Sequence, residues 1–265
     1  LIPLHADIYA FQEVQNDGFS DASAIASLTE LLGDDYDFIR TGDGHTGCDV
    51  ISVGLAYGNT VRPIGTGLVL SGGPFGTSRA GASRAPLAQV FEHAATGERI
   101  TVVVNHFKSR RAPQENTGDA NSVNSKGQGY WNPRRTESAA HLAASLEELG
   151  GNIDPDIAIV GDFNAHAYED PLRVLENAGY TNLLKPAAGQ QPPAYTYVHA
   201  GLAGALDHVL VSNGLVDQAF AFTWPIDADE PDVMDYRLRG TGATWFHATP
   251  FRASDHDPVV LDITF

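Results

Sequence analysis

The chain is 265 residues long, and its 43% hydrophobic and 18% charged residues exclude an intrinsically disordered protein. No segment approaches the ~18 consecutive apolar residues of a transmembrane helix, so no membrane segment is expected. The formal net charge of −17 argues against nucleic-acid binding by the surface as a whole, because such binding depends largely on Lys and Arg.

Helical and strand patterns alternate along the chain. We expect helices where apolar residues recur three or four positions apart, and strands where short apolar runs stand between turn residues. In chain order, the expected elements are a strand at 8–14, a helix at 20–32, strands at 49–57, 86–92 and 99–106, a helix from about 136 to 149, a strand at 156–160, a helix from 170 to about 178, and strands at 205–212, 218–222 and 258–265. No repeat or lasting change in composition divides the chain, which predicts one α/β (α+β) domain over residues 1–265.

Polar side chains stand at the ends of several expected strands. The motifs are Phe11-Gln12-Glu13-Val14, Asn105-His106-Phe107-Lys108, Gly161-Asp162-Phe163-Asn164, Leu206-Asp207-His208 and Ser254-Asp255-His256-Asp257-Pro258. Carboxylate and carboxamide oxygens suit Mg²⁺, Mn²⁺ or Ca²⁺, and imidazoles can stabilise charge on a phosphate or move protons. Together the motifs predict a hard-metal phosphate site.

Each motif also has an ordinary structural interpretation. Gly, Asp and Asn are common turn residues, Glu13 could be a surface acid, and a lone His106 is more often a packed core residue. The site is absent only if every motif has its ordinary structural role at once. Such a coincidence is improbable, so the motifs together favour a functional site. His208 is ambiguous: its neighbour Asp207 has the better claim to a role, and His208 packs near the site or borders it.

In this order, the five motifs resemble those of the endonuclease/exonuclease/phosphatase family, and the resemblance spans essentially the whole chain. Within the family, the chain is most similar to bacterial extracellular nucleases, on the basis of Gln15–Gly18, Asn105–Ser109, Gly127–Arg135 and Asp227–Pro231. The resemblance implies a four-layered sandwich of two mainly antiparallel, mixed β-sheets flanked by helices, with the site at one edge. It also implies secretion from a bacterial cell.

The resemblance implies roles for the acidic and amide residues of the motifs. Glu13 would bind the divalent metal, which we expect to be Mg²⁺ with Mn²⁺ or Ca²⁺ as alternatives, and Asp255 would lie near the same ion. Asp162 would position or deprotonate the attacking water, and Asn164 would hold a phosphate oxygen.

The histidines of the motifs are implied to act on the phosphate. His106 would stabilise its developing charge. His256, oriented by Asp207, would contact the scissile phosphate or transfer a proton, and the division of labour between His256 and Asp162 stays open.

A run of basic residues, here called the basic segment (residues 108–135), follows His106. It contains Lys108, Arg110, Arg111, Lys126, Arg134 and Arg135, against Glu115 and Asp119. The resemblance gives Arg84 a phosphate contact, and Lys108, Tyr130 and Arg134 or Arg135 are further candidates for binding the substrate backbone. Such contacts carry no sequence information, so little sequence specificity is expected. The basic segment could instead be a solvated loop.

These expectations describe a metal-dependent phosphodiesterase that binds and hydrolyses DNA, with RNA as a further candidate. The alternatives are a phosphatase or phospholipase-type phosphodiesterase of the same family, and a catalytically silent module of a larger secreted protein. A lipid enzyme should show an exposed apolar hairpin, and a silent module has no reason to keep the motifs together. The family's first strand, which ends in a metal-binding Asn, is not found before Leu1. We therefore expect a domain without that strand, either as a monomer or as one domain of a larger protein.

Overall fold

The computed structural model describes residues 4–76, 81–113, 118–124, 127–186, 195–230 and 249–265. Its strands are β1 (Ile8–Gln15), β2 (Tyr36–Phe38), β3 (Ile51–Gly58), β4 (Val61–Val69), β5 (Leu87–His93), β6 (Arg99–His106), β7 (Ile157–Asp162), β8 (Tyr180–Asn182), β9 (Tyr197–His199), β10 (Leu202–Gly204), β11 (Asp207–Ser212), β12 (Ala219–Thr223) and β13 (Val259–Ile263). Its α-helices are α1 (Ala24–Glu30), α2 (Asn132–Leu149) and α3 (Asp170–Asn177), and short 3₁₀ turns cover Gly73–Phe75, Ala120–Ser122 and Gly150–Asn152. None of these helices has the length and hydropathy that crossing a membrane requires.

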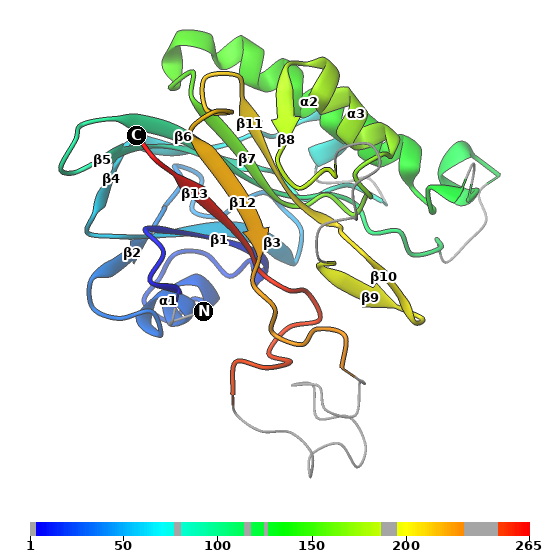
Figure 1. Cartoon of the computed structure of the whole chain (residues 1–265), viewed down its shortest axis with the longest axis horizontal. Coiled ribbons are helices and arrows are strands. Elements are labelled where there is room, and N and C mark those ends of the chain that lie inside the picture. The colour runs from blue at the N-terminus through cyan, green and yellow to red at the C-terminus, as the bar shows by residue number, and fades with distance from the viewer. Residues whose placement is uncertain (1–3, 77–80, 114–117, 125–126, 187–194, 231–248) are drawn as a thin grey trace.

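The strands form one large mixed sheet and three smaller antiparallel ones (Figure 1). The large sheet has the order β4-β5-β6-β7-β11-β8, in which β6 and β7 run parallel and the other neighbours run antiparallel. A second sheet has the order β1-β3-β2, and β12 pairs with β13. β9 and β10 form a separate hairpin.

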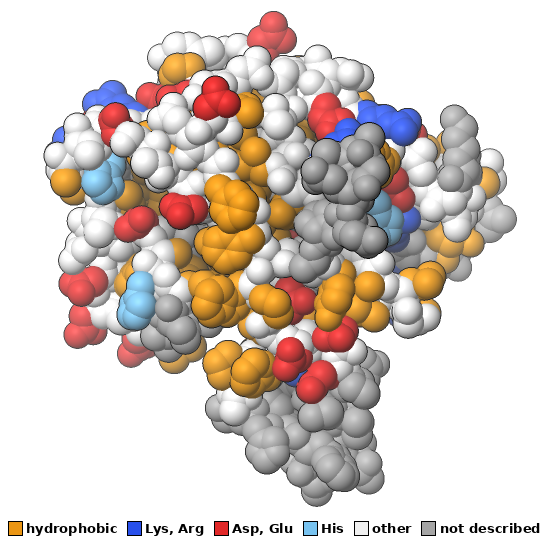
Figure 2. Space-filling view, viewed as in Figure 1, with side chains coloured by type: hydrophobic (Ala, Val, Ile, Leu, Met, Phe, Trp, Pro, Cys, Tyr) orange, Lys and Arg blue, Asp and Glu red, His pale blue; other side chains and the backbone are white. Residues whose placement is uncertain are grey.

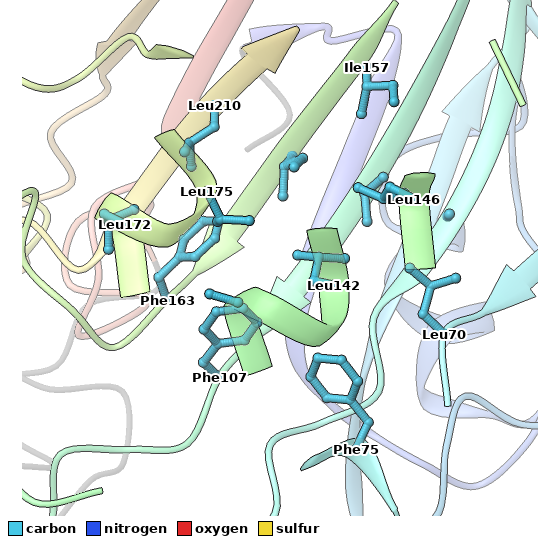
Figure 3. Packing of buried hydrophobic residues seen from close by; sticks show 14 of the residues in the cluster. Leu70, Phe75, Phe107, Leu142, Leu146, Ile157, Phe163, Leu172, Leu175 and Leu210 are labelled. Atoms are coloured by element: carbon cyan, nitrogen blue, oxygen red, sulfur yellow. The ribbon is translucent and has the colours of Figure 1, made fainter. Parts of the chain in front are cut away.

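Alternating side chains divide the two faces of the large sheet between two cores. In β6, Val103 belongs to the core on the helix side, whereas Val102 and Val104 belong to the opposite core. The helix-side core includes Leu70, Phe75, Phe107, Leu142, Leu146, Ile157, Phe163, Leu172, Leu175 and Leu210 (Figure 3). Full burial of one such side chain contributes about 1.5–3 kcal/mol, so this interface with α2 and α3 rigidly supports the strand ends.

The opposite face of the large sheet packs on the smaller sheets. Val53 and Leu55 of β3 and Leu261 of β13 belong to this core. Beyond the smaller sheets, Ile25 of α1 packs with Phe38 in a third cluster. The order of layers is therefore α2 and α3, the large sheet, the smaller sheets, and α1. The predicted α/β sandwich is confirmed, with its second layer divided between the β1-β3-β2 sheet and the β12–β13 pair.

The outer surface over β12 and β13 is apolar. Hydrophobic side chains gather there in Figure 2, and Phe220 and Trp224 are among the exposed large hydrophobic residues. The rings of Phe220 and Phe222 stack with their centroids 5.9 Å apart. The smaller sheets therefore leave apolar surface open, while α2 and α3 cover the large sheet.

Two longer elements differ clearly from the sequence prediction, and the three-residue strands β2, β8, β9 and β10 were not predicted either. β4 was not predicted because Pro63, Gly65 and Gly67 usually mark loops. The strand tolerates Pro63 and the glycines because it lies at the edge of the large sheet. At Gly67 a glycine is also required by space, because a Cβ there would lie 2.5 Å from the Ile39 side chain. Helix α2 begins at Asn132 rather than near residue 136, since a proline in the first turn loses no helical hydrogen bond.

Candidate active site

Three predicted catalytic residues lie side by side on central strands of the large sheet. Asp162, at the end of β7, is the register partner of His106 at the end of parallel β6. It is also the register partner of Asp207 at the start of antiparallel β11. Because neighbouring strands are only ~4.8 Å apart, the three side chains can meet at one edge of the sheet. The structure thus brings these residues together, and their catalytic roles stay predictions.

Asp162 is buried and is held by the turn that follows it. The backbone N–H of Asn164 donates to Asp162 Oδ1 at 2.6 Å, and the Asn164 side-chain amide donates to Oδ2 at 2.8 Å. Gly161, in β7 just before the turn, has a φ of 123°, and a Cβ there would lie 2.2 Å from the carbonyl oxygen of Asn105 on β6. Burial, followed by the nearby charge of Asp207, raises the pKa of Asp162 to about 7.

His106 lies between two carboxylates. Its Nε2 is 3.5 Å from Asp162 Oδ2 and 3.9 Å from Glu13 Oε1. Burial of the ring, together with the positive charge of Arg84, holds the pKa of His106 well below its usual range. The imidazole that faces the site is therefore neutral at neutral pH.

His256 forms a close pair with Asp207, whose Oδ2 lies 2.7 Å from His256 Nδ1. Burial by itself would lower the pKa of His256, but the charge and hydrogen bond of Asp207 raise it to about 10. The ring of Tyr197 packs on the imidazole with 4.6 Å between the centroids. His256 is therefore a cation at neutral pH, and Asp207 occupies its Nδ1.

Glu13 reaches the site from the β1-β3-β2 sheet through a β-bulge. The pairing of β1 with β3 shifts register between Phe11 and Val14, and Glu13 adopts a φ of 59°. A positive φ is uncommon for a residue other than glycine, and a bulge redirects a side chain out of the strand's alternation. The Glu13 side chain is 69% exposed, so its carboxylate is open to solvent beside His106.

The donor set around Glu13 suits a hard divalent cation that keeps most of its water. Mg²⁺ favours carboxylate oxygens and is usually held through one or two of them. Among the described residues, no group of three or more His, Cys, Asp or Glu side chains is arranged to hold a metal ion. Asp255 adjoins His256 and helps to raise its pKa. That Asp255 shares an ion with Glu13 stays a prediction.

Two predicted substrate-binding cations line a pocket beside His106. The backbone N–H of Arg84 donates to the His106 carbonyl oxygen at 3.1 Å. Arg84 and Lys108 both line a pocket of about 260 Å³ that also includes Asp49. Lys108 Nζ lies 5.4 Å from the ring centroid of Trp131. Positive charge is therefore available next to the carboxylate and imidazole groups.

Arg135 occupies an internal position instead. It is fully buried, and its guanidinium donates to the carbonyl oxygens of Lys108, Gln128 and Tyr130 at 3.2, 2.7 and 2.7 Å. Burial, followed by the charge of Arg110, lowers its pKa to about 10. This position leaves no surface for a substrate, so the prediction of a substrate contact for Arg135 is corrected to a structural role. Tyr130 is half-buried, and its own substrate contact stays a prediction.

Other cations of the basic segment pair with acids of the same protein. Arg134 is mostly buried and contacts Glu137, with Nη1 and Oε2 3.0 Å apart. Arg110 pairs with Glu169, and Lys126 lies outside the described residues. Much of the positive charge counted along the sequence is therefore compensated internally, and the placement of Arg134 gives little support to its predicted substrate contact.

Three residues next to the site were missed by sequence reasoning. Tyr197 packs on His256, and Thr196 Oγ1 accepts from the backbone N–H of Asp207 at 3.3 Å. Asp49 Oδ2 lies 3.3 Å from Arg84 Nε. Each acts on a residue far away in sequence, so no local pattern could have identified it.

Comparison with known proteins agrees with this arrangement. The sequence model described as the Endonuclease/Exonuclease/phosphatase family matches residues 2–256. A solved endonuclease/exonuclease/phosphatase from Bacteroides vulgatus is similar in structure, with a TM-score of 0.60, 17% identity, and coverage of 99% of this chain and 87% of that chain. No curated protein sequence matches the chain.

Two other solved structures show the range of proteins with this fold. The mannosyl-6-phosphatase of Bacteroides thetaiotaomicron has a TM-score of 0.59 and 16% identity, covering 100% of this chain and 88% of that chain. D. rerio TDP2 complexed with a single strand DNA product has a TM-score of 0.57 and 11% identity, covering 98% of this chain and 86% of that chain. At such low identities, these likenesses show the fold alone.

Proposed function

Because the chain belongs to the endonuclease/exonuclease/phosphatase family, whose members hydrolyse phosphoester bonds, we propose that it is a divalent-metal-dependent phosphodiesterase that cleaves DNA. RNA is a second polymer that the same chemistry would accept. The family relationship supports phosphoester hydrolysis, and the choice of a nucleic-acid substrate is the proposal.

Asp162 is suited to take a proton from the attacking water. Its pKa of about 7 lies near neutral pH, where a general base is most effective. The two hydrogen bonds from Asn164 fix the orientation of the carboxylate. A divalent ion near Glu13 would polarise the phosphate and offset its negative charge.

His256 and His106 are suited to different tasks on the same phosphate. His256, protonated and held by Asp207, presents a positive charge to the phosphate oxygens. His106 stays neutral, so it can donate one hydrogen bond without adding charge. Together they would stabilise the charge that builds up as water attacks phosphorus.

The observation that carries the choice of a polymer is the pocket of Arg84 and Lys108 beside His106. A small phosphomonoester needs only the carboxylate and imidazole site, whereas a nucleic-acid strand offers further phosphates to a neighbouring cationic pocket. The bound DNA product of D. rerio TDP2 supports a nucleic acid in this fold, and the mannosyl-6-phosphatase supports the rival sugar phosphate.

A plasmid-nicking assay tests the proposal with Mg²⁺, Mn²⁺, Ca²⁺ and EDTA in parallel. We expect nicking with at least one divalent ion, none with EDTA, and its loss in His256→Ala. Release of phosphate from mannose 6-phosphate and turnover of a phospholipid are measured on the same preparation. Turnover of either small substrate without any nicking would refute the nucleic-acid substrate, and nicking in EDTA would refute the metal dependence.

A further inference from the structure

The pocket beside His106 contains a partly unsatisfied arginine. Thr46, Asp49, Phe75, Ser83, Arg84 and Lys108 are among the residues that line its volume of about 260 Å³. The Arg84 side chain is only 15% exposed, and its Nε and Nη1 atoms are buried without a hydrogen-bond partner among the described residues. Burying donors without partners is costly, so this guanidinium favours an anion that can accept from it.

Asp49 is the anion that lies nearest to Arg84. Its Oδ2 is 3.3 Å from Arg84 Nε, an ion-pair distance that forms no hydrogen bond. Lys108 adds a second cation, whose pKa is lowered by burial and then by Arg84 and is raised by Asp49. The pocket therefore holds two cations and one carboxylate, which leaves a net positive charge for an incoming ligand.

The backbone around Asp49 is fixed, and one oxygen of its carboxylate, Oδ1, accepts from the Val50 backbone N–H at 2.8 Å, while Oδ2 faces Arg84. The Asn16 side-chain amide donates to the carbonyl oxygens of Thr46, Gly47 and Asp49 at 3.2, 3.1 and 2.9 Å. This clamp holds the loop against the pocket. The Asp49 side chain is 44% exposed, so it can turn towards solvent without unfolding the loop.

The family resemblance already implies a phosphate contact for Arg84; we propose that Asp49 is a built-in competitor for the anion that binds there. A phosphate that enters takes the place of the Asp49 carboxylate on Arg84 and also meets Lys108. A neutral group that displaced Asp49 would leave the Arg84 charge without a partner, so Asp49 makes the pocket favour anionic ligands. The identity of that ligand as a nucleic-acid phosphate rests on the proposed function, whereas the competition itself does not.

Titration with inorganic phosphate in EDTA tests the competition without cleavage or metal. Calorimetry would compare the native protein with Asp49→Asn, and with Asp43→Asn as the matched control. Asp43 is an exposed acid of the same loop outside the pocket, so its change removes the same charge. We expect Asp49→Asn to bind phosphate about threefold more tightly, and Asp43→Asn to bind it like the native protein.

Removing Arg84 shows whether Asp49 acts through it. Arg84→Met should weaken phosphate binding, and in that background Asp49→Asn should give a smaller gain, because only Lys108 remains beside Asp49. Arg84→Gln, which also removes the guanidinium charge, serves the same purpose if Arg84→Met does not fold, as judged by circular dichroism. Equal effects of the Asp49 and Asp43 changes, or an undiminished Asp49 effect without Arg84, would overturn the proposal.

The same variants separate this inference from the proposed function. If phosphate binding follows the expected pattern but plasmid is not nicked, the pocket stands and the nucleic-acid substrate fails. If plasmid is nicked but Asp49→Asn leaves phosphate binding unchanged, the substrate stands and the competition by Asp49 fails.

Discussion

The strand ends of the large sheet and the basic segment both looked functional in the sequence, yet the structure treats them differently. At the strand ends, register puts His106 and Asp207 beside Asp162. In the basic segment, Arg135 is buried on carbonyl oxygens and Arg134 pairs with Glu137. Both groups were predicted to act on the substrate, but the structure gathers the strand-end residues at one site and places Arg134 and Arg135 in internal contacts.

The difference shows which sequence patterns carry positional information. A side chain at the end of a buried strand has few possible positions, because hydrogen bonding fixes the register and pleating fixes the face. A cation in a loop has many, and its position depends on which acids and carbonyl groups lie nearby. Clusters at strand ends are thus better evidence for a site than net positive charge along a loop.

Asp162→Asn gives the largest expected effect at the strand ends. We expect kcat for plasmid cleavage to fall about a thousandfold, because the variant cannot accept a proton. Stability should change by about 1 kcal/mol or less: Asn avoids the cost of ionising a buried carboxyl, but its NH2 group faces a donor of Asn164 in place of one carboxylate oxygen. Asp217→Asn, at an exposed acid, is the control. A loss of less than tenfold would remove Asp162 from the chemistry.

Arg135→Met tests the basic segment, where we expect the substitution to affect stability rather than catalysis. We expect the free energy of unfolding to fall by about 3 kcal/mol, since three carbonyl oxygens lose their donor. Arg111→Met, at an exposed residue of the same segment, should change it by less than about 0.5 kcal/mol. Urea denaturation measures both. An unchanged stability with a raised KM would restore Arg135 as a substrate contact.

Asp207→Asn sharpens the assignment of the histidine pair. The pKa of His256 should drop, because the charge and hydrogen bond of Asp207 hold it at about 10. We expect kcat to fall about a hundredfold as His256 loses its charge and orientation. NMR titration of the metal-free protein follows the pKa, and steady-state kinetics follow kcat. A His256 pKa that stays high in the variant would contradict the pairing.

Substitution of His208, a buried neighbour of the site, gives the smallest expected effect, which is on how stability depends on pH. Its Nε2 lies 2.9 Å from the Ala165 carbonyl oxygen, and burial lowers its pKa below 6.5. The unfolded chain then binds a proton more readily, so the stability contributed by neutral His208 is full above about pH 6.5 and is lost as the pH falls below it.

Denaturation at pH 7 and pH 5 measures this linkage. The native protein should lose about 1 kcal/mol more on acidification than His208→Gln, whose side chain does not titrate. Equal losses in the two proteins would show that His208 is not held neutral by the fold.

The sequence predicted the fold class, the order of most strands and the five motifs that carry the family resemblance. It missed β4, since Pro63 and Gly67 obscure an edge strand. It also missed the short strands β2, β8, β9 and β10, which have three residues each. Such short runs have too little periodicity to identify a strand, because their pairing depends on distant partners.

The sequence by itself determined which residue types stand at the strand ends, because the alternation of a strand and the residues of a turn depend only on neighbours in the sequence. Only the tertiary structure decided that His106 is neutral and His256 charged, that Arg135 is internal, and that Asp49 lies beside Arg84. The reason is that desolvation and ion pairing depend on groups brought together from distant parts of the chain. Asp49 and Arg84, or Asp207 and His256, are far apart in the sequence and become partners only when the sheets pack.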